Sequence, residues 1–503
     1  MSSTDAEIAT AARAFRTELF IGGRWVAPAE GGRLEVIDPS TGRRVGEVAA
    51  ASTSDVDAAV AAARAAFDAG RWSGLSGRER SRVLLRVASL MRERLEELAQ
   101  AESLDVGKPI LFTRMIDVPN SADLFEYYAT LAPHVDGSVR DTPLPAFAYT
   151  RREPRGVVGA ISPFNFPLIL SSSKIAPALA VGNTMVHKPS PLTTLSAILM
   201  SEILAEAGVP DGVYNLITGA GSDLGEALVR HPDVDMIAFT GSTKVGREVA
   251  SLAGRLLKPV AAELGGNAAN IVFADADLDK VIGTVINSFV FNTGQFCMSA
   301  PRLLVERPIY DTVVGILADA VTHVPLGRPG EDGTVIGPLV SAAQLERVEA
   351  MVGDAVAAGG TIAAGGERID LDGGFYYAPT VIAGLDNDAG AIQEEVFGPV
   401  LTVQPFDTES EAVALANSTD YGLAAGVQTT DISRAHRVAN ALHAGIIWVN
   451  GWAMLDAAVP FGGVKASGWG RENGAEALES YTRVKSVTIA VDPLPAAEAG
   501  GAS

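Results

Sequence analysis

The chain contains one cysteine, Cys297, at the end of the segment FNTGQFC, where a helix-like run gives way to a loop. A cysteine thiolate is a strong nucleophile, but a free thiol has a pKa near ~8.5 and is barely ionised at neutral pH. No histidine lies close in the sequence, so activation would have to come from backbone dipoles or from a distant base. The alternative is a small buried hydrophobic residue, the usual role of a lone cysteine. In either case the chain can form no internal disulfide and no cysteine-rich zinc site.

Two further polar residues stand where they could assist a nucleophile. Asn165 lies in ISPFNFPL, directly after the strand-like VVGA, and the two prolines of this block stiffen the backbone around it. An amide held rigidly at the end of a strand can donate to a developing oxyanion, although a turn asparagine more often bonds its own backbone. Glu263 is followed by Gly265 and Gly266, so its carboxylate could move and activate water as a general base. It could also be a surface residue of a flexible turn.

Two glycine-containing turns could bind a phosphate group. Residues 219–225 (GAGSDLG) follow the strand-like YNLIT and open a helix, but their spacing is one residue longer than the dinucleotide fingerprint. Residues 239–246 (FTGSTKVG) enter another helix, whose N-terminal amides beside Ser242 suit a pyrophosphate. Neither segment is a Walker A loop, and each could be an ordinary strand-to-helix turn. Farther along, Glu395 and Phe397 lie in a Gly-Pro turn and could hold a sugar hydroxyl and a flat ring.

The composition restricts the class of function. The 503 residues are 48% hydrophobic, and their formal net charge of -21 opposes binding to nucleic acids or to anionic membranes. The first residues include acids where a signal peptide would be basic, and no apolar run reaches about 18 residues, so we expect a soluble, cytoplasmic protein. The six histidines lack metal-binding spacing, so we expect no catalytic metal, and the chain lacks the G-x-S-x-G motif of a serine hydrolase.

Helical and strand-like segments alternate through most of the chain. Residues 54–70 are typical of a helix with Ser54 as its N-cap, and a longer helical pattern covers 77–104 and stops at Gly107-Lys108-Pro109. Short apolar runs (VVGAIS, TMVH, VYNLIT, MIAFT and NIVFA) then alternate with helices at 195–207 and 222–230, and the alternation resumes after Cys297 (RLLVE, TIAAGG, PVLTVQPF and GIIWVN). This pattern predicts an α/β fold with two doubly wound parallel sheets, which bind ligands beyond the C-terminal ends of their strands. We expect the polar tail 493–503 to be disordered.

Taken in order, these segments resemble the aldehyde dehydrogenase superfamily from about Leu19 to Val491. Seven blocks carry the resemblance: ISPFNFPL, GNTMVHKPS, FTGSTKVG, ELGG, FNTGQFC, EEVFGPV and PFGGVKASGWGRE. The only cysteine falls inside one of them, which favours a nucleophile over a buried hydrophobic residue. The resemblance implies the NAD(P)⁺-dependent oxidation of an aldehyde to a carboxylic acid.

The resemblance also implies roles for individual residues. Cys297 would attack the aldehyde to give a thiohemiacetal, and the Asn165 side chain with the Cys297 backbone N–H would form the oxyanion hole. Hydride transfer to the nicotinamide would leave a thioester, and Glu263 would activate the water that hydrolyses it. The implied cofactor-binding residues are Ile161, Ser162, Pro163, Phe164, Lys188, Ser190, Gly221, Gly225, Thr240, Gly241, Ser242, Gly246, Leu264, Glu395 and Phe397.

The resemblance leaves the choice between NAD⁺ and NADP⁺ open. Lys188 would reach the adenine ribose, and NAD-preferring relatives often carry a glutamate three residues after this lysine, where this chain has Pro191. Without that carboxylate, Lys188 and Ser190 could pair with a 2′-phosphate. We therefore expect NADP⁺ to be at least tolerated.

The substrate-binding residues implied by family position are mostly apolar. They are Phe166, Leu170, Ser173, Phe296, Met298, Trp452, Leu455 and Phe461. Ser173 stands where many relatives have a large tryptophan, which would widen the substrate tunnel. Apolar, aromatic walls favour a flat or hydrophobic aldehyde, and the blocks ISPFNFPL and KPSP are similar to those of benzaldehyde-type dehydrogenases.

The family fold implies three parts. A dinucleotide-binding domain would comprise 1–135 and 155–264, a catalytic domain 265–470, and a small β bridging element 136–154 and 476–492. In relatives this element adds a strand to a neighbouring subunit's sheet, so we expect a homodimer or homotetramer. Two other activities stay open. One is a CoA-acylating aldehyde dehydrogenase, which usually lacks the general-base glutamate, and the other is a cysteine esterase without redox chemistry.

Overall fold

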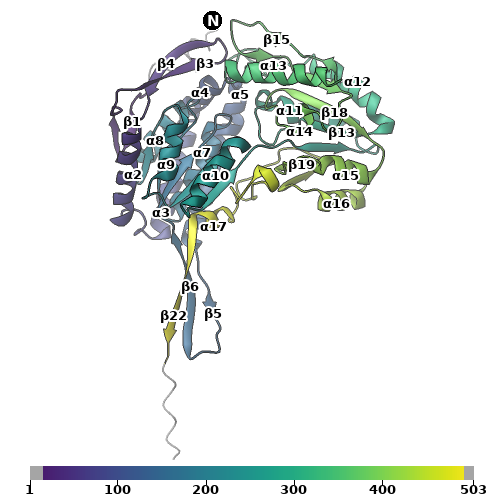
Figure 1. Cartoon of the computed structure of the whole chain (residues 1–503). Coiled ribbons are helices and arrows are strands. Elements are labelled where there is room, and N and C mark those ends of the chain that lie inside the picture. The colour runs from purple at the N-terminus through teal and green to yellow at the C-terminus, as the bar shows by residue number, and fades with distance from the viewer. Residues whose placement is uncertain (1–14, 492–503) are drawn as a thin grey trace, which may run out of the picture.

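Two mixed β-sheets, each covered by helices on both faces, form the body of the protein, and a narrow three-stranded arm projects from it (Figure 1). The computed structural model describes residues 15–491, so the predicted tail 493–503 lies outside the described residues. Within residues 15–491, none of the helices combines the length and the apolar character needed to cross a bilayer.

The first sheet provides five parallel strands in its centre. Its order is β2 (Arg24–Val26), β1 (Leu19–Ile21), β9 (Tyr214–Leu216), β8 (Thr184–Lys188), β7 (Val157–Ile161), β10 (Met236–Thr240), β11 (Val260–Glu263) and β21 (Gly468–Trp469). The chain adds β8 and β9 on one side of β7 and adds β10 and β11 on the other, so the order reverses between β7 and β10. Loops at such a reversal diverge and leave a crevice that can receive a ligand.

Helices on both faces explain why the central strands are buried. One face is covered by α2 (Thr53–Asp68), α9 (Ser222–Arg230) and α10 (Thr243–Arg255). The other is covered by α7 (Pro167–Ala180) and α8 (Leu195–Glu206), with α3 (Gly77–Glu93), α4 (Leu95–Val106) and α6 (Val118–Leu131) packed outside them. Strands β8 and β10 are buried at every residue, because neither face meets water.

The second sheet repeats this arrangement. Its order is β14 (Thr361–Ala364), β17 (Thr380–Ala383), β18 (Val400–Phe406), β13 (Arg302–Glu306), β12 (Ala269–Val272), β19 (Ala424–Gln428) and β20 (Ile446–Val449), and every pair except β14·β17 is parallel. Helices α11 (Leu278–Val290) and α12 (Tyr310–Val321) pack on one face, and α15 (Glu409–Asn417) and α16 (Ile432–Ala441) pack on the other. The predicted α/β class with two doubly wound sheets is confirmed.

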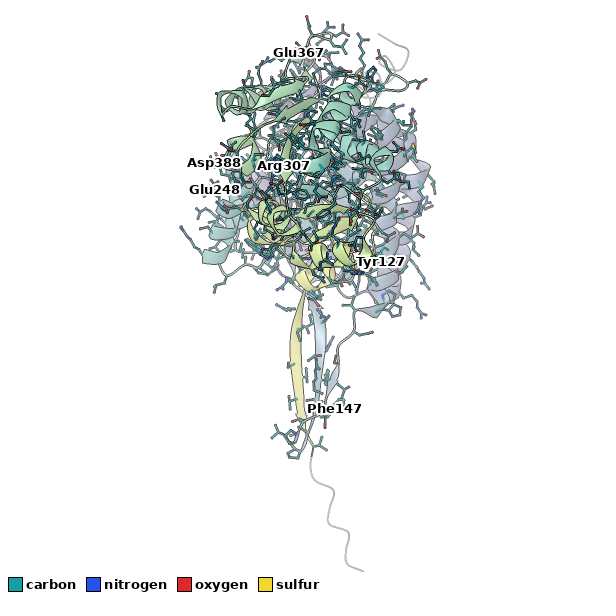
Figure 2. The ribbon with its side chains drawn as sticks, turned by 90° about the vertical axis from the view of Figure 1, so that its right-hand side faces the viewer. Tyr127, Phe147, Glu248, Arg307, Glu367 and Asp388 are labelled. Atoms are coloured by element: carbon teal, nitrogen blue, oxygen red, sulfur yellow. The ribbon has the colours of Figure 1, made fainter. Side chains whose placement is uncertain are left out.

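Smaller elements complete the described chain. They are β3 (Arg33–Asp38), β4 (Arg43–Ala49), α5 (Ile110–Phe112), α13 (Ala342–Ala357), β15 (Arg368–Ile369), β16 (Tyr376–Tyr377), α14 (Gly390–Gln393) and α17 (Ala477–Tyr481). The arm consists of β5 (Val139–Arg140), β6 (Ala146–Pro154) and β22 (Thr482–Ala490) in the order β22-β6-β5. Strand β22 is therefore an edge strand, and Phe147, near the far end of the arm, is exposed (Figure 2). An apolar, unpaired edge supports the predicted role in oligomerisation, which stays a prediction.

Two helix boundaries differ from the prediction. Ser52, rather than Ser54, is the N-cap of α2, because the buried Asp55 carboxylate accepts the backbone N–H groups of both Ser52 (2.8 Å) and Ala29 (3.0 Å). The pattern 77–104 is broken at Arg94, whose guanidinium bonds Glu97 within α4 and Glu202 of α8 (2.6 and 2.8 Å). Both corrections arise from contacts with distant segments, which the helical period cannot encode.

Candidate active site

Cys297 lies in a loop that the chain holds in an unusual conformation. After α11 ends at Val290, Asn292 and Thr293 adopt left-handed backbone angles (φ 51° and 56°), which are costly for residues other than glycine. The Asn292 side-chain amide donates to the carbonyl oxygens of Asn165 (2.8 Å) and Gln295 (3.0 Å). These bonds compensate for the strain and fix the loop immediately before the cysteine.

Asn165 lies in the loop that follows β7, at the strand-order reversal of the first sheet. It is buried, and the Asn292 bond fixes its carbonyl oxygen. Its side-chain amide has no hydrogen-bond partner within residues 15–491, so its N–H groups are free to donate. The next residue, Phe166, stacks 5.2 Å from the ring of Phe296, which precedes Cys297. The Asn165 and Cys297 loops are thus joined by both a hydrogen bond and a ring contact.

Glu263 is the last residue of β11 and is only 3% exposed, so it is not a surface residue of a flexible turn. The chain then approaches the cysteine closely: a Cβ atom at Gly266 would lie 2.3 Å from the Cys297 carbonyl oxygen. Only glycine permits this approach. The backbone N–H of Gly463 donates to the Glu263 carboxyl group, and its Oε2 has no partner in the described part of the chain. Within these residues one carboxyl oxygen is therefore unpaired but buried, and Glu263 is not among the residues that line the cavity beside Cys297.

The electrostatics of the site raise the pKa values of both Glu263 and Cys297. Burial and the neighbouring Glu472 carboxylate raise the pKa of Glu263 well above its usual range, although Lys174 and Arg471 oppose this shift. Burial, followed by the negative charges of Glu395 and Glu263, raises the pKa of Cys297, while a hydrogen bond from the Met298 N–H lowers it. Burial and neighbouring negative charge therefore disfavour ionisation of both Cys297 and Glu263.

The sequence analysis did not identify a buried ion pair beside this site. Lys174 of α7 pairs with Glu472, and their side chains are 0% and 5% exposed. Lys174 also donates to Thr240 Oγ1 (2.5 Å), and Ser173 donates to Glu472 Oε2 (2.7 Å). A signal was present, because a lysine inside the apolar stretch 168–181 needs a buried partner. Its partner is about 300 residues away, which no local pattern reveals.

The predicted cofactor residues of the first sheet gather at the C-terminal ends of its parallel strands. Ile161 ends β7, Lys188 ends β8, Thr240 ends β10, and Leu264 follows β11. The loop residues Ser162, Pro163 and Phe164 follow β7, and Ser190 lies two residues beyond β8. Gly221 caps α9, and Gly225 lies inside that helix. Gly241 and Ser242 lead into α10. Ser162 is anchored to β8, since its N–H donates to Lys188 O (3.1 Å) and its hydroxyl lies 2.8 Å from Nε2 of His187.

The fit of these residues to a dinucleotide rests on several observations. A Cβ at Gly246 would lie 2.2 Å from the Leu264 side chain, so glycine lets α10 pack tightly against the end of β11. The exposed Ser242 caps α10 and leaves the helix N-terminus open to an anion. No carboxylate within residues 15–491 pairs with Lys188, whose pKa is lowered by burial. The chain thus offers a cation and helix amides on one side of the crevice.

Glu395 and Phe397 reach the same crevice from the second sheet. The Glu395 Oε1 accepts the Gly266 N–H (3.1 Å), and burial raises the pKa of Glu395 to about 8. The rings of Phe397 and Phe164 lie edge to face, with their centroids 5.7 Å apart. These residues precede β18, and Cys297 precedes β13, so they lie at the N-terminal edge of the second sheet. These candidate residues thus lie at the opposite edge from the C-terminal strand ends where doubly wound sheets usually bind ligands.

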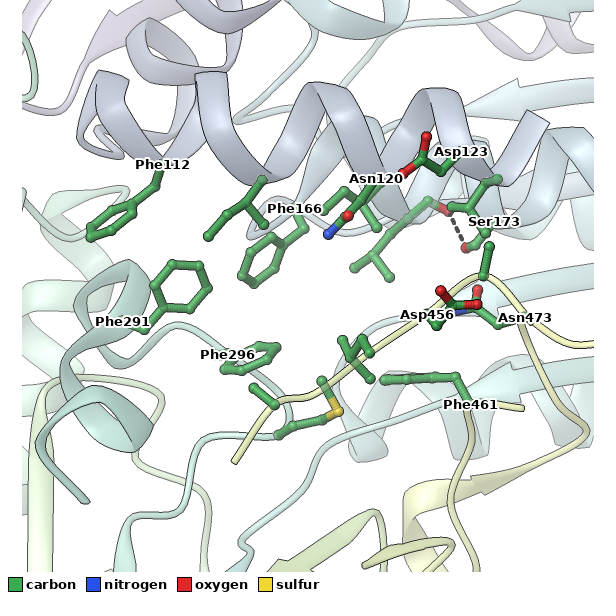
Figure 3. Close-up of a pocket in the computed structure, with 18 of the residues that line it drawn as sticks. Phe112, Asn120, Asp123, Phe166, Ser173, Phe291, Phe296, Asp456, Phe461 and Asn473 are labelled. Carbon is green, nitrogen blue, oxygen red and sulfur yellow. Dashed lines mark hydrogen bonds between the residues drawn. The ribbon is translucent and has the colours of Figure 1, made fainter. Parts of the chain in front are cut away.

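A cavity of about 940 Å³ opens beside Cys297 (Figure 3). All eight predicted substrate residues line it: Phe166, Leu170, Ser173, Phe296, Met298, Trp452, Leu455 and Phe461. Its walls come from α6, α7, α11 and the loops on either side of the crevice between the two sheets. Cys297 itself is part of the lining and is only partly buried. A molecule in the cavity can therefore reach the sulfur.

Comparisons with known proteins give a consistent result. The family model described as "Aldehyde dehydrogenase family" matches residues 25–487. A betaine aldehyde dehydrogenase from Staphylococcus aureus, solved with NAD⁺, is 38% identical, with 97% of each chain covered and a TM-score of 0.95. An indole-3-acetaldehyde dehydrogenase from P. syringae, solved as a cysteine-to-alanine mutant with NAD⁺ and IAA, is 40% identical (97% and 99% covered, TM-score 0.94). A putative aldehyde dehydrogenase from Burkholderia cenocepacia is 42% identical (96% and 99% covered, TM-score 0.93).

The raised pKa of Cys297 can be measured by alkylation, because the chain has no other cysteine. We expect iodoacetamide to label the free protein more slowly than a small free thiol at pH 7, with the rate still rising above pH 9, because only the thiolate reacts. Glu395→Gln should lower this pKa and accelerate labelling at pH 7, since it removes a nearby negative charge. The exposed Asp388→Asn is the matched control. Equal labelling rates for both variants would contradict this account.

Proposed function

Because the chain belongs to the aldehyde dehydrogenase family, we propose that Cys297, Asn165 and Glu263 carry out the oxidation of an aromatic or hydrophobic aldehyde to its carboxylic acid. The protein is an NAD-dependent aldehyde dehydrogenase. The observation that carries the catalytic assignment is the convergence of three loops: Asn292 joins the loops of Asn165 and Cys297, and Gly266 brings the loop of Glu263 against Cys297.

The first half of the reaction is nucleophilic attack on the aldehyde. The Cys297 sulfur bonds to the carbonyl carbon and gives a thiohemiacetal, while negative charge develops on the oxygen. The unpartnered Asn165 amide and the Cys297 backbone N–H would donate to that oxygen. The proton that leaves the thiol neutralises that oxygen to give the thiohemiacetal hydroxyl, and it is released as H⁺ when hydride leaves the carbon; the surrounding carboxylates oppose its loss from sulfur.

The second half converts the thiohemiacetal to the acid. The nicotinamide, when bound, supplies the hydride acceptor. The thioester left on Cys297 is then hydrolysed by water, which the free Oε2 of Glu263 would deprotonate. Burial and the Glu472 carboxylate raise the pKa of Glu263, so its ionisation is disfavoured and must precede its action as a base. The presence of Glu263 also favours water over CoA as the acceptor of the acyl group.

Replacement of Glu263 should separate the two halves. We expect Glu263→Gln to retain a single burst of NADH per Cys297 and to slow steady-state turnover by about 10²–10⁴-fold, because a general base is lost. In the wild type, turnover should rise with pH as Glu263 ionises, and in the variant this limb should disappear. Stopped-flow absorbance of NADH measures both quantities.

Two controls define this test. Cys297→Ala should show neither burst nor turnover, since no covalent intermediate can form. Added CoA should change neither rate in the wild type. Full steady-state activity in Glu263→Gln, or an absolute requirement for CoA, would exclude hydrolysis assisted by Glu263.

For the cofactor, we assign the adenine ribose to Lys188, the pyrophosphate to Ser242 and the N-terminus of α10, and the nicotinamide ribose to Glu395 with Phe397. The remaining cofactor residues named above would shape the crevice around it. Support comes from their common position at the strand-order reversal and from the contacts of Glu395 and Phe397 with Gly266 and Phe164. NAD⁺ is present in related structures.

The residue at position 191 provides a test of cofactor choice. We expect the wild type to use NADP⁺ as well as NAD⁺, because no carboxylate stands three residues after Lys188 to repel a 2′-phosphate. Pro191→Glu should lower kcat/KM for NADP⁺ at least about tenfold relative to NAD⁺, equivalent to ~1.4 kcal/mol. Pro191→Gln, which adds bulk without charge, should not. Strict NAD⁺ dependence of the wild type would refute this expectation.

The lining of the cavity supports an aromatic or hydrophobic substrate. Five phenylalanines and Trp452 contribute to it, and aromatic side chains pack favourably against a flat ring. Related structures include a betaine aldehyde dehydrogenase and an indole-3-acetaldehyde dehydrogenase. These two aldehydes differ in charge, so similarity to related structures does not by itself identify the substrate.

Initial rates of NADH formation with two aldehydes test this proposal. We expect benzaldehyde to be oxidised with a kcat/KM at least about tenfold above that of succinic semialdehyde, whose carboxylate would lose hydration in the apolar cavity. Phe296→Ala should reduce the preference, because it removes a ring from the lining. Efficient turnover of succinic semialdehyde with none of benzaldehyde would overturn the substrate assignment and leave the dehydrogenase activity intact.

A further inference from the structure

The cavity has two chemically different ends. Figure 3 shows Phe112, Phe166, Phe291 and Phe296 together on one side, and we call these residues the aromatic end. Asp123, Ser173, Asp456 and Asn473 lie on the other side, together with the ring of Phe461, and we call the four polar residues the polar end. The rings of the aromatic end contact one another, with centroid distances of 5.2 to 5.9 Å among Phe166, Phe291 and Phe296.

The polar end exists because Ser173 is small. Ser173 is buried, lines the cavity and donates its hydroxyl proton to Glu472 Oε2 (2.7 Å). A bulky side chain at this position of α7 would fill the space between Glu472 and the rim. Toward solvent, this end is bounded by the exposed carboxylates Asp123 and Asp456.

The polar end offers mainly hydrogen-bond acceptors. Asp123 is paired with Arg92 (2.7 Å), whereas Asp456 forms no ion pair within residues 15–491. One oxygen of Asp456 accepts the Ala458 N–H (2.8 Å), which leaves the other available. The Asn473 side chain has no hydrogen-bond partner in the described structure, and its backbone is left-handed (φ 54°). Carboxylates accept but cannot donate, so this end suits a donor.

Local electrostatics agree with this assignment. Burial, together with the carboxylates of Glu476 and Asp456, raises the pKa of Tyr127, another residue of the lining. The volume of the cavity also agrees with a substituted aromatic substrate. A cavity of about 940 Å³ is at the upper end of the range of about 300–1,000 Å³ that holds drug-sized ligands. A single unsubstituted ring would leave much of it empty.

We propose that the preferred substrates are aromatic aldehydes that carry a hydrogen-bond donor, a hydroxyl or an ammonium group, on the part of the ring distant from the aldehyde. The ring would occupy the aromatic end, and the donor would bind Asp456 and Asn473 in the polar end. This inference rests on the proposed oxidation of aromatic aldehydes. It makes Asp456 and Asn473 specificity-determining residues and Ser173 the residue that gives access to them.

A set of four aldehydes tests the proposal with the intact enzyme and NAD⁺. Benzaldehyde reports the basic activity, 4-methylbenzaldehyde adds size without a donor, 4-hydroxybenzaldehyde adds a neutral donor, and 4-(dimethylaminomethyl)benzaldehyde adds a cationic donor. We expect at least one donor-bearing aldehyde to exceed the methyl compound about tenfold in kcat/KM, the effect of one hydrogen bond to a charged acceptor. Preference for the cation or for the hydroxyl identifies which donor is recognised.

Variants show whether the preference arises in the polar end. Asp456→Asn keeps the acceptor for Ala458 but removes the charge, and Asn473→Gly removes the amide without straining the left-handed backbone. Both should bring the ratio of donor to methyl substrate close to one, and Ser173→Trp should do so by filling the space. Asp388→Asn, exposed and outside the cavity lining, should keep the wild-type ratio. Comparing ratios cancels the effect of each substituent on carbonyl reactivity.

The outcomes are distinguishable. A ratio near one in the wild type, or a high ratio that survives Asp456→Asn and Asn473→Gly, would overturn the role of the polar end while benzaldehyde oxidation continued. Failure to oxidise any of the four aldehydes would instead refute the proposed aromatic-aldehyde activity on which the inference rests.

Discussion

The site depends on one amide side chain, that of Asn292. Its two hydrogen bonds connect the loop after β7 in the first sheet with the loop before β13 in the second. Together with the bond from the Gln295 N–H to Asn292 O (3.0 Å) and that from the Thr293 hydroxyl to Gly337 O (3.0 Å), they hold two successive non-glycine residues in the left-handed conformation. The bonds therefore do two things: they compensate for local strain, and they set the separation of the Asn165 amide from the sulfur. The proposed nucleophile and oxyanion donor precede and follow strands of different sheets, so the proposed mechanism needs such a connection.

A short connection between β11 and β12 determines which edges of the two sheets face each other. Only residues 264–268 separate the end of β11 from the start of β12, so the C-terminal edge of the first sheet must face the N-terminal edge of the second. Helix α11 then returns the chain to that N-terminal edge, which places Cys297 beside Gly266. The same reasoning explains Glu395 and Phe397, which precede β18. The candidate residues thus lie at the C-terminal strand ends of the first sheet, where doubly wound sheets usually bind ligands, and at the opposite edge of the second.

Some features of the fold and of the candidate site could be predicted from the sequence, and others could not. Local signals identified the strands β7, β8 and β10, the helix α9 and the fold class, because a strand buried on both faces must be apolar throughout. The family blocks indicated Cys297, Asn165 and Glu263, and all eight predicted substrate residues line one cavity. Long-range contacts could not be predicted from the sequence. Examples are the Lys174–Glu472 ion pair and the helix break at Arg94. A third is strand β21, which lies in the range expected for the second domain but pairs with β11 of the first sheet.

The buried charges disfavour ionisation of both the thiol and the candidate base in the free protein. The carboxylates of Glu395, Glu263 and Glu472 disfavour ionisation of the Cys297 thiol, and that of Glu472 disfavours ionisation of Glu263. The positive charge of Lys174 opposes the raised pKa of Glu263, and Lys174 also forms an ion pair with Glu472. A cationic ring entering the crevice would shift this balance toward the thiolate. Keeping the nucleophile protonated in the free enzyme would also protect the only cysteine from oxidation and alkylation, because these reactions require the thiolate.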